Sequence, residues 1–174
     1  MREKRTNSHF KLAAIAISAI VAFSTLFVIL LNPYKIQLST TKKEVVLLGN
    51  YLNSHIIRVH IGKDKKWLQE RLKHREFIRF VSSFYNAEQA ESIIRDTLDE
   101  HRNRLESWVR DQTVTKNMRK SFRKTFTTPV GFGLPRSDIN NGQELYSVKV
   151  VVQKVNAHSY KIISAYPIPS QRNN

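Results

Sequence analysis

The sequence predicts an α+β domain in which helices come first and an antiparallel sheet follows. From about residue 45 to 114, apolar residues recur at helical spacing, whereas after Val114 glycine, proline and asparagine appear and β-branched residues replace helix formers. A third observation adds a separate helix ahead of this domain. Residues 12–31 are apolar except for Ser18, Ser24 and Thr25, a run long enough to cross the roughly 30 Å core of a bilayer as a helix.

The charge around this apolar run predicts its orientation. Arg2, Lys4, Arg5 and Lys11 precede it, and the positive-inside rule therefore keeps the N-terminus in the cytoplasm. We expect a basic cytoplasmic tip over residues 1–11, a transmembrane anchor or signal segment over 12–31 and a linker over 32–44. The protein would then lie in the inner membrane with its C-terminal domain exported, in the periplasm or outside the cell. Cleavage of the segment as a signal peptide would make the domain secreted.

The expected domain covers residues 45–170, and its first half is helical. A short helix follows from Val45 through Val59 and ends near Gly62. Asp64 is a typical N-cap for a helix to about Glu76, with Trp67, Leu68, Leu72 and Phe77 facing inward. After an extended segment at 80–85, Asn86 caps the longest helix, from 87 to about 110, whose apolar stripe is Ala90, Ile94, Leu98, Leu105 and Trp108.

The second half is predicted to be the sheet. Residues 122–132, 144–155 and 160–168 are typical of strands, and polar turn residues at 138–142 and 156–158 separate them.

Composition limits the classes of function. Lysine and arginine number 29 against 14 acidic residues, a net charge of +15, which favours a polyanionic partner: nucleic acid, anionic lipid or an acidic protein. The chain has no cysteine, which excludes disulfides, thiolate zinc sites and cysteine nucleophiles. Phosphate-binding glycine loops, the HExxH motif and the Gly-x-Ser-x-Gly elbow are absent, and we predict no metal and no cofactor.

Several segments, in this order, resemble a known domain: HIIRVHIG from residue 55, WLQERL from 67, VGFGL from 130, SVKVVVQK from 147 and YKIISAYPIP from 160. They are similar to the ribonuclease A-like toxin domain at the C-termini of bacterial contact-dependent growth inhibition proteins, over about residues 45–169. The resemblance implies a kidney-shaped α+β fold, RNA cleavage without a metal and no need for disulfides. It also implies a neutralising immunity protein, which we expect to be acidic to match a basic cleft.

The resemblance also implies the site. The family histidine before Val/Ile-Gly falls on His60, and the arginine of its Leu-x-x-Arg-Leu helix falls on Arg71. The threonine and tyrosine of its Thr-Ala-Tyr-Pro strand fall on Ser164 and Tyr166. Serine in place of threonine keeps the hydroxyl but loses the methyl group that restricts its rotamer.

The chemistry of these residue types agrees with such roles. RNA cleavage by its own 2′-hydroxyl needs a base, a cation for the charge on phosphorus and a proton for the leaving oxygen. Histidine transfers protons near neutral pH, and arginine offers a planar fork to phosphate oxygens. Ser164 and Tyr166 are two apart on a predicted strand, so both point to one face, where they would bind the phosphate. His55, five residues before His60, is a candidate substrate contact.

Each of these residues also has a purely structural interpretation. His60 would then be a helix-terminal histidine, Arg71 a solvated helix charge and Tyr166 a core aromatic. His74, His101 and His158 are expected at the surface.

We therefore expect a metal-independent endoribonuclease, and the resemblance implies that it acts as a toxin. The alternatives from other classes are a membrane-anchored envelope or secretion-system subunit and a domain that binds nucleic acid without cutting it.

Overall fold

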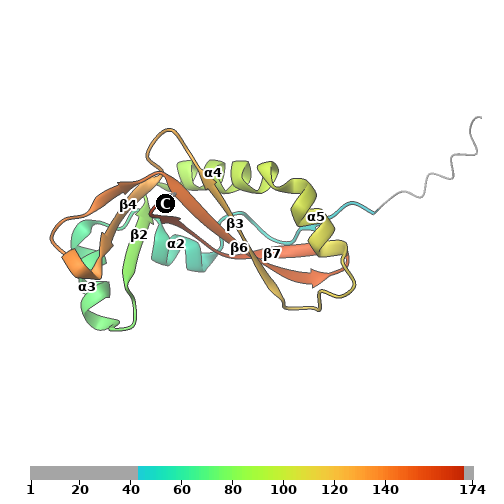
Figure 1. Cartoon of the computed structure of the whole chain (residues 1–174), viewed down its shortest axis with the longest axis horizontal. Helices are drawn as coiled ribbons and strands as arrows, with labels where there is room; N and C mark the ends of the chain where they lie inside the picture. The colour runs from blue at the N-terminus through green and yellow to red at the C-terminus, as the bar shows by residue number, and fades with distance from the viewer. Residues whose placement is uncertain (1–42, 171–174) are drawn as a thin grey trace, which may run out of the picture. The chain divides into compact units, whose positions relative to one another are not determined.

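Two antiparallel sheets organise residues 43–170, the part of the chain that the computed structural model describes (Figure 1). The larger sheet has the strand order β1-β7-β6-β3. Its strands are β1 (Val46–Leu47), β3 (Arg119–Thr125), β6 (Ser147–Asn156) and β7 (Ser159–Ile168), and only the short β1 pairs in parallel. The smaller sheet, β2-β4-β5, contains β2 (Phe80–Phe84), β4 (Gly131–Pro135) and β5 (Gln143–Leu145).

Four α-helices accompany the sheets: α2 (Ser54–His60), α3 (Lys65–His74), α4 (Ala87–Glu100) and α5 (Arg102–Arg110). Asn53, Asp64 and Asn86 cap the first three by accepting a hydrogen bond from a backbone N–H three residues on. A 3₁₀ turn, η1 (Arg136–Asp138), follows β4. The predicted α+β class and the caps at Asp64 and Asn86 are confirmed. The predicted tip, the membrane or signal segment and residues 32–42 lie outside the described residues. Within 43–170, no helix is long and apolar enough to span a membrane.

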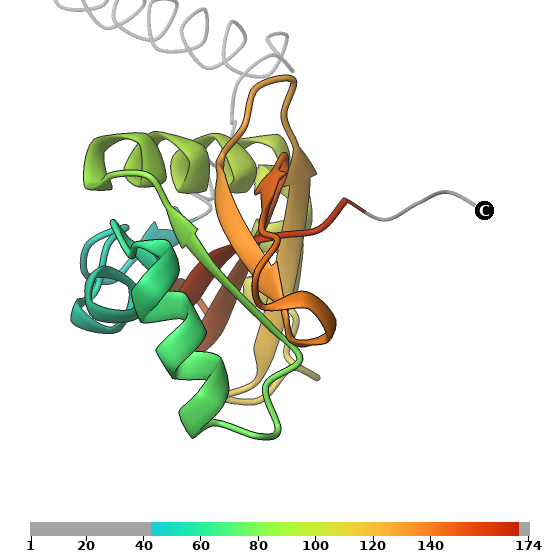
Figure 2. The same cartoon turned by 90° about the vertical axis from the view of Figure 1, so that its left-hand side faces the viewer.

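Each sheet has its own apolar core. Helix α4 lies along the larger sheet and buries Ile94 and Leu98 against strand residues such as Val150. Helix α3 covers the smaller sheet, where Leu68 and Leu72, one turn apart, pack on Val81 of β2 and Leu134 of β4. Figure 2 shows α3 beside β2, with α4 above. The domain is thus built from two lobes that meet where β2 approaches β7.

The predicted single helix from 87 to 110 is wrong, because it breaks at His101. The backbone of His101 leaves the helical region, and its imidazole Nε2 lies 2.9 Å from the carbonyl oxygen of Arg123 in β3. The ring also lies 5.4 Å from that of Phe122. These contacts with the sheet redirect the chain into α5.

Three further boundaries differ from prediction. The expected strand 122–132 divides between the two sheets, because Pro129 cannot continue a ladder and the chain crosses from β3 to β4 there. The expected strand 144–155 is β5 and β6, separated at Tyr146. The first helix begins only at Ser54, and Val46–Leu47 form β1 instead.

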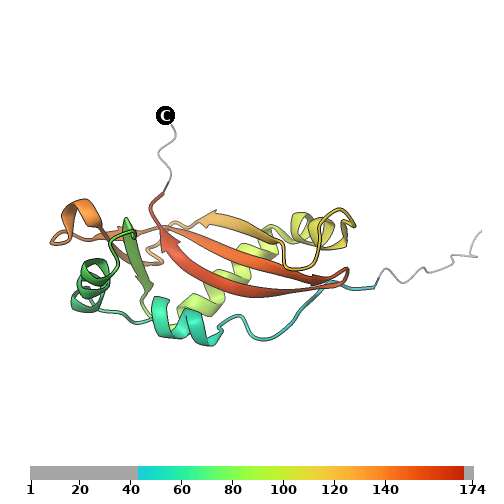
Figure 3. The ribbon, with the colours of Figure 1, turned by 90° about the horizontal axis from the view of Figure 1, so that it is seen from below.

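The two lobes approach closely where β2, β4 and β7 meet. Ser82 Oγ donates a 2.6 Å hydrogen bond to the carbonyl oxygen of Pro167. Gly131 permits this approach, because a Cβ there would collide with the carbonyl oxygen of Ser83 and lie 2.7 Å from Cγ of Pro167. The end of β7 is therefore held against β2, which Figure 3 shows from below beside α2.

Candidate active site

His60 is the last residue of α2 and is held against β2. The chain leaves the helix through Ile61, which forms a parallel bridge with Phe84. Gly62 then turns the chain with φ +62°, a left-handed conformation that favours glycine, and its N–H donates to the Phe84 carbonyl oxygen at 3.0 Å. The Lys63 N–H donates to Ser83 Oγ at 2.9 Å. These backbone contacts fix the end of α2 at the junction of the lobes.

A cavity of about 360 Å³ opens at this junction. His60 from α2, Arg71 from α3, Ser82 from β2 and Tyr166 from β7 all line it. Phe80 and Pro167 are among its apolar walls. Three of the four predicted catalytic residues, far apart in the sequence, therefore share one hollow.

The imidazole of His60 lies between two partners. Its ring stacks on that of Tyr166, with 5.2 Å between centroids and 26° between planes. Its Nδ1 makes a long contact of 3.5 Å with the carbonyl oxygen of Ser82. Because a carbonyl oxygen only accepts hydrogen bonds, this contact favours the tautomer protonated on Nδ1, which leaves Nε2 with a free lone pair.

The surroundings of His60 oppose its positive form. The pKa of His60 is lowered to about 4, first by burial and then by the charges of Arg71 and His55, while the Ser82 carbonyl acts in the opposite direction. The imidazole is therefore neutral at pH 7 and able to accept a proton on Nε2. A bound phosphate would raise this pKa, because its negative charge favours the imidazolium.

Arg71 reaches the same cavity from the flank of α3. Its neighbours Leu68 and Leu72 are buried in the small core, which orients the helix and leaves Arg71 facing the hollow. The guanidinium lies over the Trp67 ring, 5.4 Å from the centroid. Burial and then the charge of Arg75 lower the pKa of Arg71. None of the ion pairs found within residues 43–170 involves Arg71, so its charge is available for an anion.

A β-bulge in β7 orients Tyr166. Val151 of β6 pairs with Ser164 and Val152 with Ile162, so Ile163 is an extra residue. Beyond the bulge Ala165 and Pro167 are buried, and Ser164 and Tyr166 alternate with them on the other side of the strand. Tyr166 lines the cavity, but Ser164, two residues back, does not.

His55 lies on α2 beside the cavity. Its exposed ring meets that of His60 edge-on, with 5.7 Å between centroids. It lines a second, larger hollow of about 650 Å³, which also includes Arg71. His55 is thus placed next to the cavity.

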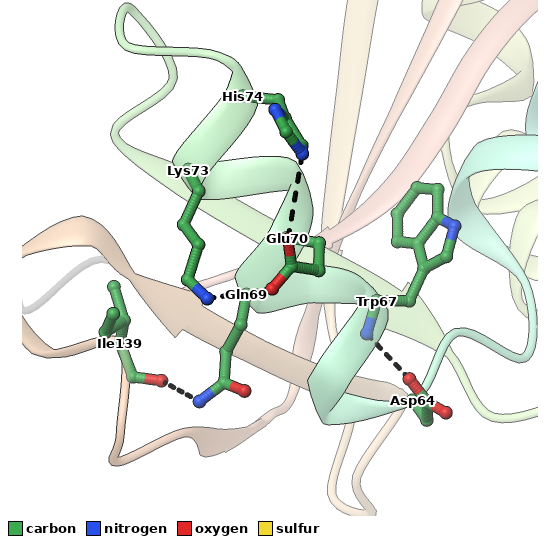
Figure 4. A network of polar contacts seen from close by, with 7 residues as sticks. All are labelled: Asp64, Trp67, Gln69, Glu70, Lys73, His74 and Ile139. Carbon is green, nitrogen blue, oxygen red and sulfur yellow. Dashed lines mark hydrogen bonds and ion pairs between the residues drawn. The ribbon is translucent and has the colours of Figure 1, made fainter.

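The expected surface histidines differ from one another. His74 is exposed and lies 3.7 Å from Glu70 on α3 (Figure 4). His101 and His158 are only partly exposed, and Nδ1 of His158 is buried without a hydrogen-bond partner. The surface prediction therefore holds for His74, whereas the other two are half-buried at the surface.

Two aromatic side chains of this region are more exposed than their apolar character predicts. Trp67 and Phe77 were expected to face inward, but they are 37% and 77% exposed. Trp67 follows its cap Asp64 and lies beneath Arg71, and Phe77 lies in the loop after α3. The backbone carbonyl of Ser82 was missed altogether, since no side-chain pattern reveals it. Within 43–170, no group of three histidine, aspartate or glutamate side chains is arranged to hold a metal ion.

Comparison with known proteins gives the family and the fold of the chain. Residues 54–167 match the family described as Bacterial CdiA-CT RNAse A domain. The fold is similar to a solved structure described as the crystal structure of a CdiA-CT/CdiI complex from Y. kristensenii 33638, with a TM-score of 0.58 and 21% sequence identity. The match covers 67% of this chain and all of that one. No curated protein matches significantly.

Proposed function

Because the chain belongs to the family of bacterial CdiA-CT RNase A domains, we propose that it is a toxin domain that cleaves RNA by attack of the 2′-hydroxyl on the neighbouring phosphate. The observation that carries this proposal is the shared cavity of His60, Arg71 and Tyr166. A neutral imidazole, an uncompensated guanidinium and a phenol around one hollow supply a base, a cation and a hydrogen-bond donor. Together they meet the needs of this reaction without an external nucleophile.

In the first step, His60 acts as the general base. Its Nε2 accepts the 2′-hydroxyl proton while the 2′-oxygen forms a bond to phosphorus. The long contact of Nδ1 with the Ser82 carbonyl holds the ring in the required tautomer. The bond from phosphorus to the 5′-oxygen breaks, and the products are a 2′,3′-cyclic phosphate and a free 5′-hydroxyl.

Arg71 and Tyr166 act on the phosphate. The guanidinium binds the non-bridging oxygens, whose negative charge grows as the fifth bond to phosphorus forms. The phenol of Tyr166, stacked on the imidazole, donates its one proton to the leaving 5′-oxygen. Ser164 lies on the same side of β7 but outside the cavity walls, so its role is the orientation of Tyr166 or contact with a longer substrate. His55, beside His60, contacts the substrate.

The test is RNA cleavage by the purified full chain in EDTA. We expect 2′,3′-cyclic phosphate ends, and His60→Ala should lower the rate by about 10²–10⁴-fold. His101→Ala is the matched control, because His101 lies outside the cavity. Equal activity of the wild type and His60→Ala would refute the assignment. Salt-sensitive binding with RNA recovered intact would favour a non-catalytic RNA-binding domain instead.

An inhibitory protein partner follows from the same family. The similar Y. kristensenii structure is described as a complex of CdiA-CT with CdiI, and we expect an immunity protein for this chain as well. Its binding surface should be acidic, because the chain has a net charge of +15 and arginine at the cavity. Co-purification of a neighbouring gene product that blocks RNA cleavage would support this expectation. A stable envelope partner without any effect on cleavage would favour the structural-subunit alternative.

The predicted location is tested separately. We expect residues 12–31 to hold the chain in the inner membrane with the domain exported, or to be removed so that the domain is secreted. Protease protection in spheroplasts, combined with the mass of the mature chain, distinguishes these two outcomes.

A further inference from the structure

The second hollow, beside the catalytic cavity, is a groove between α2, α3 and the loop after α3. It has a volume of about 650 Å³, nearly twice that of the catalytic cavity. Arg71 and Ile78 line both hollows, so the two adjoin at these residues. Any polymer that places its reacting phosphate against Arg71 therefore has this groove as a direct extension.

The charge of the groove suits a polyanion. Arg58, Arg71 and Arg75 line it, and none of the three takes part in the ion pairs found within residues 43–170. The one lining carboxylate, Glu70, is held by Lys73 at 2.8 Å and lies 3.7 Å from His74, as Figure 4 shows. The three arginines are therefore available to bind an anionic ligand.

Aromatic side chains also line the groove. Phe77 is 77% exposed, the largest exposure among the exposed large apolar side chains of residues 43–170. Burying such a ring is normally favourable, so its exposure points to a ligand that covers it. Trp67 is less open, because Lys63 Nζ and the Arg71 guanidinium each lie 5.4 Å from its ring centroid.

The loop that carries Phe77 is fixed in place. Arg136 donates from Nε to the Ile78 carbonyl oxygen at 2.7 Å and from Nη2 to the carbonyl oxygens of Leu72 and Arg75, the latter at 2.7 Å. Ile78 packs on the small core directly after Phe77. The phenyl ring is thus presented from a loop anchored on both sides, which reduces the entropy lost when a ligand covers it.

On the basis of the proposed function, we propose that this groove binds the nucleotide next to the cleaved phosphate in single-stranded RNA. Its base stacks on Phe77, and Arg58 and Arg75 contact the adjoining phosphates. Stacking on an open ring requires an unpaired base, so the groove selects single strands over duplex and tolerates any base.

The decisive experiment measures binding independently of cleavage. The probe is a short fluorescent 2′-O-methyl oligonucleotide, which lacks the attacking hydroxyl, and anisotropy with the full chain gives its affinity. Phe77→Ala should weaken binding about tenfold, while Phe77→Trp should retain it. Met118→Ala is the matched control, because Met118 is a 48% exposed apolar residue just before β3, away from the groove. Thermal unfolding verifies that each variant is folded.

A second probe separates stacking from charge. An oligonucleotide of abasic residues carries the same phosphates without bases, and its affinity should not change in Phe77→Ala but should fall in Arg58→Ala and Arg75→Ala. Equal affinity of the wild type and Phe77→Ala for the base-containing probe would overturn the proposal. An equal loss for both probes would also overturn it, since the ring would then act only through the loop.

Cleavage assays distinguish this proposal from the proposed function. If the domain is a ribonuclease, Phe77→Ala should raise KM for a dinucleotide and for a longer oligonucleotide alike, whereas Arg58→Ala and Arg75→Ala should raise it only for the longer one, which carries the adjoining phosphates. If no RNA is cleaved, the proposed function fails. The binding comparison would still show whether the groove binds single-stranded RNA through Phe77.

Discussion

Helices α3 and α4 are both amphipathic, but their polar faces differ. On α4, charged side chains pair within the helix or at its end, as Glu91 does with Arg95 at 2.9 Å and Asp99 with Arg102 at 2.6 Å. On α3, Arg71 lies between two cavities and over an aromatic ring, without a carboxylate partner. The difference teaches that a charge on a helix indicates function when it lacks a partner and faces a hollow. The paired charges of α4 contact each other, α5 or, at Glu100, Lys124 of β3 at 3.3 Å, and none of them lines the catalytic cavity.

Removing the Arg71 charge on α3 should have the largest effect on activity. Arg71→Ala is expected to lower kcat for RNA cleavage by about 10³-fold, equivalent to about 4 kcal/mol, because the charge on the phosphate then lacks its cation. Arg71→Lys should retain only part of the wild-type kcat, since an ammonium lacks the planar fork of a guanidinium. Arg95→Ala on α4 is the control and should leave kcat unchanged. A similar loss in both variants would contradict the comparison.

Removing the core of α4 should act on stability instead. Ile94→Ala is expected to lower the free energy of unfolding by about 3–4 kcal/mol, because Ile94 is fully buried and leaves a cavity. Denaturant unfolding measures it, and the activity of the folded fraction should stay near that of the wild type. Leu68→Ala in α3 is the counterpart, since it should lower stability and also kcat by displacing Arg71. Normal kcat in Leu68→Ala would show that α3 packing does not position the site.

The buried imidazole should make stability depend on pH. The pKa of His60 is about 4 in the folded chain against about 6.5 unfolded, so the unfolded state takes up the proton first as pH falls. The contribution is therefore present above pH 6.5 and is lost towards pH 4, and it amounts to about 3 kcal/mol. Unfolding at pH 7 and pH 4 should show a smaller loss in His60→Gln than in the wild type. Identical losses would mean that His60 titrates normally.

The turn that holds His60 should have a smaller effect. Gly62→Ala is expected to cost about 1–2 kcal/mol of unfolding free energy, because alanine is strained at φ +62°. It should also lower kcat, since Gly62 fixes the end of α2. Gly49→Ala is a matched control, also at positive φ but before α2, and should cost stability without changing kcat. Unchanged kcat in both would indicate that the turn does not position His60.

The smallest effect is expected from the paired charges of α4. Glu91→Gln removes the exposed ion pair with Arg95 and should lower the free energy of unfolding by only about 0.3–0.5 kcal/mol. This loss should be smaller still in high salt, because salt already screens the pair in the wild type. Thermal unfolding at two salt concentrations measures it. A loss of unfolding free energy above about 1 kcal/mol would contradict the interpretation of the polar face of α4 as a solvated surface.

Local patterns predicted much of the fold. Caps such as Asp64 and Asn86 act within three residues, so the sequence alone reveals them. The break at His101 was not predictable in this way, because its cause is a contact with Arg123 on a strand distant in the sequence. The crossing between sheets at Pro129 carried a readable signal, but the β-branched residues around it outweighed that signal.

The candidate site was predicted through resemblance rather than from residue spacing. His60, Arg71 and Tyr166 lie on three elements, and only tertiary packing brings them to one cavity. The roles given to them and to Ser164 and His55 remain proposals for the assays above. The exposure of Phe77 was missed because hydrophobicity normally indicates burial, and only the packing of Ile78 and Arg136 reveals that the loop points outward.

The extra residue Ile163 has a consequence for the comparison of relatives. Deleting it would leave regular two-residue alternation along β7 without turning Tyr166, because Val151 already pairs with Ser164 and Val152 with Ile162, and Ala165 would stay on the buried side. A homologue one residue shorter at this point would thus present the same side chains to its substrate, with the alignment gap at Ile163. Pairing with β6, more than strand length, is the quantity to inspect when activity is inferred across this family.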